Sequence, residues 1–116
     1  MERVRLLADH RPPQRPALVV STGDRLAIGD LSEEWPAFRR CIKRNDSGGW
    51  IPDRYLSHLS TGEALALRSY DTTELAAVER QTVSVIEADD ESGWLWCRAD
   101  AGHEGWIPIR SVVPVA

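Results

Sequence analysis

The sequence predicts an all-β protein built from two copies of one small β-barrel. The first observation is a repeat, because Gly-Trp-Ile-Pro stands at 49–52 and again at 105–108. Short alternating runs and turn-rich breaks fill the chain, and no stretch of helical length shows helical periodicity. Three rare residue types also recur with one common spacing, as the pairs Trp50 and Trp106, Pro52 and Pro108, and Cys41 and Cys97.

The second copy is predicted to contain three short strands, two turns and a 3-10 turn. Residues 82–85 alternate polar and apolar, and residues 94–98 carry the aromatics that favour strands. Pro108 is expected to end a strand and set the 3-10 turn, because its φ is fixed and it offers no amide. In order, the predicted elements are strand 82–85, turn 87–93, strand 94–98, turn 99–105, strand 106–107, the 3-10 turn from Pro108 and extended residues 112–113.

The first copy is predicted to repeat this plan over about 55 residues, a length near the lower limit for independent folding. Its elements are strand 25–28, a loop through 35–36, strand 38–42, turn 43–49, strand 50–51, a 3-10 turn from Pro52 and an extended residue at Leu56.

Composition limits the classes of function. The 116 residues include 18 acidic and 14 basic side chains, and the formal net charge is −4. A nucleic-acid partner is therefore not expected, since such binders carry a basic surface that replaces counterions on phosphates. No run approaches the roughly 20 apolar residues that span a bilayer, and Leu6, Leu7 and Ala8 are too few for a signal peptide. We expect a cytoplasmic protein with no membrane partner and with Cys41 and Cys97 as free, buried thiols.

Several motifs resemble the Src homology 3 domains, of the variant type. In the second copy these are ALRSYD at 66–71, EL at 74–75, SGWLWC at 92–97 and GWIPIRSV at 105–112; the first copy ends similarly with GWIPDRYL at 49–56. The pair is also similar to bacterial two-copy proteins of this family, in which EWP precedes a strand of the first copy, as at 34–36. The resemblance implies two tandem Src homology 3-like barrels with short 3-10 turns, at 1–58 and 64–116, joined by a linker at 59–63.

The resemblance also implies a groove of aromatic side chains that binds proline-rich peptides in the polyproline II conformation. In the second copy it would contain Tyr70, Trp94, Trp106 and Pro108, with Glu74 facing a basic side chain of the ligand. In the first copy it would contain Phe38, Trp50, Pro52 and Tyr55. Arg68 and Ser111 stand where the family has groove tyrosines.

Strand alternation independently predicts which residues of the second copy face outward. If Leu95, Cys97 and Ile107 point into the barrel, Trp94, Trp96 and Trp106 point out. Exposed aromatics suggest a contact site, although the two barrels could instead bury these rings against each other.

No catalytic chemistry is predicted. His10, His58 and His103 are read as surface residues without metal-ligand spacing, and no acid, base and nucleophile are brought together by a motif. We therefore expect neither a cofactor nor a bound metal ion.

The leading hypothesis is a non-enzymatic protein-interaction module, monomeric or weakly dimeric, whose partner is a protein or a peptide such as a proline-rich one. The alternative is a structural or assembly protein whose Trp faces pack between the barrels or in a homodimer. Recognition of cell-wall peptides ranks third.

Overall fold

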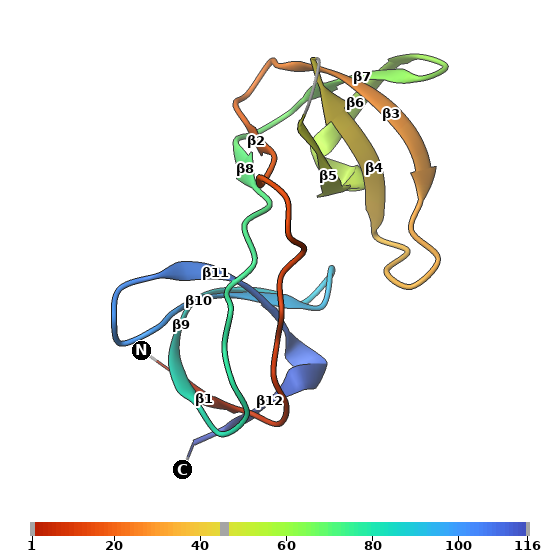
Figure 1. Ribbon diagram of the computed structural model, residues 1–116. Coiled ribbons are helices and arrows are strands. Elements are labelled where there is room, and N and C mark those ends of the chain that lie inside the picture. The colour runs from red at the N-terminus through yellow and green to blue at the C-terminus, as the bar shows by residue number, and fades with distance from the viewer. Residues whose placement is uncertain (1, 45–46, 116) are drawn as a thin grey trace. The chain divides into compact units, whose positions relative to one another are not determined.

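The computed structural model describes residues 2–44 and 47–115, and shows two β units with no α-helix in these ranges (Figure 1). Unit 1 comprises Met1–Gln14 with Thr73–Ala116, and unit 2 comprises Arg15–Thr72. The predicted all-β class with two small domains is confirmed. Each unit contains a five-stranded antiparallel sheet and one 3-10 turn.

Unit 2 has a sheet in the order β5-β4-β3-β7-β6, with the short pair β2-β8 beside it in the same unit. The 3-10 turn η1 follows Pro52, and two strands extend into the turn predicted at 43–49, since β4 ends at Lys43 and β5 begins at Ser47. Asn45 and Asp46 of that predicted turn lie outside the described residues. The elements are β2 (Val19–Val20), β3 (Arg25–Leu31), β4 (Phe38–Lys43), β5 (Ser47–Pro52), η1 (Asp53–Tyr55), β6 (Leu56–Ser60), β7 (Glu63–Ala66) and β8 (Tyr70–Asp71).

Unit 1 has a sheet in the order β11-β10-β9-β1-β12. The predicted strands are present, but β9 continues through part of the turn expected at 87–93. The 3-10 turn begins one residue after Pro108, which is the last residue of β11. The elements are β1 (Arg3–Leu6), β9 (Thr82–Asp89), β10 (Trp94–Arg98), β11 (Glu104–Pro108), η2 (Ile109–Ser111) and β12 (Val112–Pro114).

The first strand of the chain completes the barrel of the last strands. In Figure 1 the red strand β1 runs beside β9 and the blue strand β12. Val4 is the register partner of Val83 on β9 and of Pro114 on β12. In unit 2 the corresponding place between β3 and β6 is filled by β7, with Ala64 opposite Leu26 and His58. We call β1 and β7 the opening strands of units 1 and 2.

The two opening strands make matching hydrogen bonds in their units. Leu6 N donates to Gln81 O at 2.9 Å, as Ala66 N does to Asp24 O at 2.9 Å in unit 2. Leu7 N donates to the O of Ser111, the last residue of η2, at 2.8 Å, and Leu67 N donates to the O of Tyr55, the last residue of η1, at 2.8 Å. Each opening strand therefore occupies the same position in its own sheet.

The predicted domain boundaries differ from this arrangement. The residues expected to link two barrels, 59–63, form the end of β6, a turn at Thr61 and Gly62, and the start of β7. Gly62 has φ +88°, which suits a two-residue hairpin turn and is strained for other residues. Because this hairpin keeps residues 63–72 beside β6, they complete the barrel of residues 15–60 and not that of residues 73–116.

The core of unit 1 confirms the predicted inward face of its strands. Leu95, Cys97 and Ile107 are buried together with Val4 and Leu6 of the opening strand. Cys41 holds the equivalent place in unit 2, and both cysteines are free thiols with 0 % exposure. Burial raises the pKa of each thiol to about 11, so neither forms a reactive thiolate near neutral pH.

The opening strand of unit 2 follows β6 in the chain, and that of unit 1 comes from the N-terminal segment. We call this arrangement the exchange of opening strands, and it predicts which fragments fold. Residues 15–72 hold every strand of unit 2 and should unfold cooperatively, with a free energy of unfolding of about 3 kcal/mol for so small a core. Residues 1–58 lack β7 and β8, lose the buried Ala64, Ala66 and Tyr70, and should stay unfolded. Circular dichroism with urea titration of both fragments checks this, and a folded 1–58 fragment would contradict it.

Candidate functional site

Aromatic side chains from two separate stretches of the chain meet in unit 2. Tyr55 ends the 3-10 turn η1, and Tyr70 begins β8. Their ring centroids lie 5.8 Å apart at an interplanar angle of 49°, within the range of favourable aromatic pairs. Because Tyr70 follows the opening strand β7, it reaches Tyr55 only through the exchange described above.

Two arginines pack against the ring of Tyr55. The guanidinium carbon of Arg54 lies 4.4 Å from the ring centroid and that of Arg68 lies 4.6 Å from it. The same two side chains donate to the Tyr55 hydroxyl, at 2.8 Å and 3.4 Å. These distances fit cation–π contacts. We call Tyr55, Tyr70, Arg54 and Arg68 the Tyr55 cluster.

The other predicted residues of the first copy lie on β4 and β5 of the same unit. Phe38 and Pro52 are register partners, and both are buried. Trp50 is 37 % exposed, with the guanidinium of Arg40 6.0 Å from its ring centroid. Trp50 and Tyr55 are therefore the members of the predicted first groove that retain accessible ring surface.

Unit 1 carries a row of indole rings across β10 and β11. Trp96 faces Trp106, and Trp94 faces Pro108, as register partners. The rings of Trp96 and Trp106 stack edge to face with centroids 5.2 Å apart, and Trp96 Nε1 donates to Glu104 Oε1 at 2.8 Å. We call Trp94, Trp96, Trp106 and Pro108 the tryptophan row.

The expectation that Trp106 is exposed was wrong. It shares the outer face with Trp96, as predicted, but it is only 8 % exposed. Its backbone is held by the segment that precedes Leu75, because Trp106 N donates to Thr73 O at 2.9 Å and Leu75 N donates to Trp106 O at 3.1 Å. The Trp96–Trp106 contact therefore contributes to the packing of unit 1.

Glu74 contacts His10, which belongs to the same unit. Its Oε1 lies 3.1 Å from His10 Nε2, while His10 Nδ1 donates to Leu75 O at 2.8 Å. The His10 ring also packs edge to face on Trp94, with centroids 6.0 Å apart. His10 was predicted to be a surface residue, and this was wrong, because its side chain is only 13 % exposed.

These contacts change the protonation of His10. Burial of the ring disfavours its charged form, but the hydrogen bonds to Glu74 and to the Leu75 carbonyl, with the charge of Glu74, outweigh burial. They raise the pKa of His10 above the ordinary value of about 6.5. The charged imidazolium is thus more favourable in the folded protein than in the unfolded chain.

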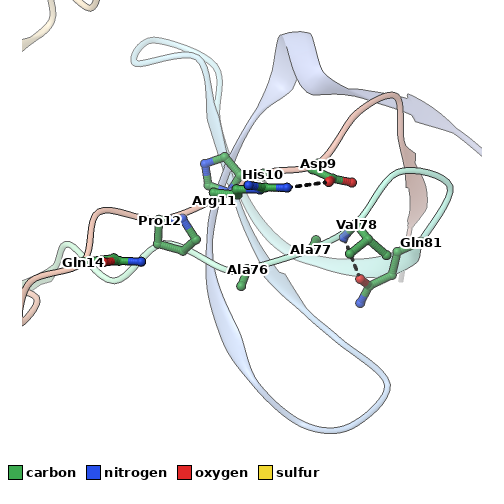
Figure 2. Close-up of a pocket in the computed structure, with 9 residues that line it drawn as sticks. All are labelled: Asp9, His10, Arg11, Pro12, Gln14, Ala76, Ala77, Val78 and Gln81. Carbon is green, nitrogen blue, oxygen red and sulfur yellow. Dashed lines mark hydrogen bonds and ion pairs between the residues drawn. The ribbon is translucent and has the colours of Figure 1, made fainter.

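An open pocket, lined in part by His10, lies between residues 9–14 and 76–81 (Figure 2). The dashed lines in Figure 2 mark the contact of Arg11 with Asp9 at 3.4 Å and of Val78 N with Gln81 Oε1 at 3.0 Å. Its walls come from the segment that follows β1 and from the segment that precedes β9. The lining residues are Asp9, His10, Arg11, Pro12, Gln14, Ala76, Ala77, Val78 and Gln81.

The groove predicted for the second copy is divided between the units. Tyr70 lies in unit 2, whereas Glu74, Trp94, Trp106 and Pro108 lie in unit 1. In unit 1 the position of Tyr70 is taken by His10, since His10 bridges to Ala77 as Tyr70 pairs with Val20. The residues predicted for the first copy, by contrast, all lie in unit 2.

Sequence reasoning missed His10, Arg54 and Arg68. Arg68 was noted only as a departure from the family, and Arg54 follows directly on the 3-10 turn's first residue without a pattern of its own.

Within residues 2–44 and 47–115, no group of three or more His, Cys, Asp or Glu side chains is placed to hold a metal ion. The same ranges contain no helix of the length and apolarity needed to cross a membrane.

The raised pKa of His10 predicts how the stability of unit 1 depends on pH. A folded-state pKa above the unfolded one adds stability that is complete below about pH 6.5 and is lost as the pH rises through the folded pKa. Glu74→Gln should lower the His10 pKa and weaken this dependence. Proton NMR titration of His10 in both proteins checks the shift, and a midpoint at or below 6.5 in the unchanged chain would contradict it.

A family model for the variant SH3 domain matches residues 67–115. Neither the comparison with curated proteins nor that with solved structures found a match. The matched segment crosses the division between the units, because residues 67–72 lie in unit 2 and residues 73–115 in unit 1. Residues 67–115 are thus similar to one variant SH3 domain, and they begin directly after the strand β7 (Glu63–Ala66).

Proposed function

We propose that the chain is a non-enzymatic protein-interaction module whose main contact surface is the Tyr55 cluster of unit 2. SH3 domains are in general protein-binding modules, and their shallow aromatic surfaces bind polyproline II segments. The matched segment supplies Arg68 and Tyr70 to this cluster. The observation that carries the proposal is the pairing of Tyr70 with Tyr55 at 5.8 Å beside Pro52, which unites residues from both sequence copies.

We further propose that unit 2 is a second barrel of the same type. Its sheet order, β5-β4-β3-β7-β6, is matched element by element in unit 1 by β11-β10-β9-β1-β12. Its 3-10 turn follows the same Gly-Trp-Ile-Pro motif. Chain order alone differs, since the opening strand of unit 2 follows β6.

The charges of the Tyr55 cluster favour an acidic ligand. Arg54 and Arg68 both lie against the Tyr55 ring, so a carboxylate of a peptide bound at this cluster would meet two guanidinium groups. This is the opposite of the basic ligand expected from Glu74, which is engaged with His10 in unit 1. The partner is therefore proposed to be a proline-containing segment flanked by Asp or Glu.

Binding of two matched peptides tests this function. Both contain the same Pro-x-x-Pro core, one flanked by Glu and the other by Lys, and each is titrated into the 15N-labelled full chain. We expect the Glu peptide to bind with a dissociation constant in about the micromolar range, with shifts at Tyr55 and Tyr70 that weaken with salt. Arg68→Glu should weaken binding by at least about threefold, the scale of an exposed ion pair.

The matched control is Arg44→Glu, which makes the same charge change at an exposed residue of unit 2 outside the cluster. It should leave the affinity within about twofold. The proposal would be contradicted if both variants lost affinity equally or if the Lys peptide bound more tightly. It would also be contradicted if neither peptide shifted the Tyr55 signal at millimolar concentration.

A further inference from the structure

The opening strand β1 is joined to the rest of the chain differently from every other strand of unit 1. It is four residues long, and its neighbours β9 and β12 come from the far end of the sequence. The strands β9 to β12 follow one another directly, whereas all of unit 2 lies between β1 and them. Unit 1 is therefore closed by a segment that arrives from elsewhere in the chain.

The contacts of β1 lie within unit 1. Val4 and Leu6 enter its core, and Leu6 exchanges backbone hydrogen bonds with Gln81 and Arg80 at 2.9 and 2.8 Å. Arg3 donates to Ser84 Oγ at 2.8 Å and to Asp100 at 2.9 Å. Any copy of this strand, whether from the same chain or another, would make the same contacts.

The segment after β1 favours an extended connection. Residues 10–16 read HRPPQRP, with Pro12, Pro13 and Pro16. Consecutive prolines hold the backbone near polyproline II and stiffen it against a tight return. An extended connection can lead into the sheet of a second chain as well as into that of its own, and exchange of an identical element between protomers is a low-cost route to a dimer.

We propose that a second copy of this chain donates β1 to unit 1, so that two chains form a homodimer by reciprocal strand exchange. Unit 2 keeps its own opening strand in the monomer and in the dimer, because the β6–β7 hairpin supplies that strand from the adjacent residues. Every contact within the barrels is kept, and only the path of residues 11–14 changes. His10 of the partner subunit then meets Glu74 and Trp94.

Cysteine pairs placed across a register pair report which chain supplies the strand. Arg5 lies opposite Thr82 in the β1–β9 ladder, and Arg25 lies opposite Leu65 in the β3–β7 ladder. Antiparallel partners have Cα atoms about 4.5–5.5 Å apart, a spacing that suits a disulfide. The native Cys41 and Cys97 are fully buried and do not compete.

The experiment oxidises the full-length double variants Arg5→Cys/Thr82→Cys and Arg25→Cys/Leu65→Cys after equilibration at about 5 µM and about 500 µM, followed by non-reducing denaturing gels. We expect the covalent dimer of the first variant to increase at least about fivefold with concentration, as mass action requires. The second variant should stay monomeric at both concentrations, because its strands are joined by the local hairpin.

Two outcomes of the oxidation experiment would overturn the proposal. One is that the first variant forms only intrachain disulfides at both concentrations. The other is that both variants form covalent dimers to the same extent, since this would show association without specific exchange of β1. Sedimentation of the unsubstituted chain provides a second measurement, in which a species of twice 13.0 kDa must grow with concentration. A single monomeric species throughout would likewise contradict it.

Discussion

The two-residue turn between β6 and β7 is the constraint on which the rest of the structure depends. A hairpin closed by Thr61 and Gly62 forms from neighbouring residues and so costs little loop entropy. It fixes residues 63–71 in the barrel of the first copy. The sheet of residues 73–115 then needs another opening strand, and the N-terminal segment, which has the matching pattern of buried residues at Val4 and Leu6, is the one that fills it.

The identity of the opening strand in each unit decides which side chains meet at the Tyr55 cluster of unit 2 and around Glu74 and Trp94 of unit 1. Tyr70 is carried to Tyr55, where Arg54 and Arg68 give the site a positive character. His10 takes the corresponding place in unit 1, where it contacts Glu74 and packs on Trp94. One exchange of strands thus turns a repeat of two similar sequences into two units with different surfaces, of which the Tyr55 cluster is the one proposed to bind a peptide.

Much of the fold could be predicted from local patterns, because strand alternation and turn residues act over short distances. The inward face at Leu95, Cys97 and Ile107 and the 3-10 turns after Pro52 and Pro108 are of this kind. Local patterns could not predict the exchange of opening strands, because β1 and β7 both fit the same position in either sheet. Only the length of the connecting segments decides which of the two strands joins which sheet. The contacts of His10 and of Arg68 were missed for the same reason, since both follow from the exchange.

The most direct test of this account is the set of cross-strand Hα–Hα nuclear Overhauser effects in the labelled full chain. Facing residues of antiparallel strands give strong effects at their close pairs. We expect effects that join β1 to β9, around Val4 and Val83, and β7 to β3, around Ala64 and Leu26. Effects that join β7 to β9 and β1 to β3 would show that each copy keeps its own opening strand, and would contradict it.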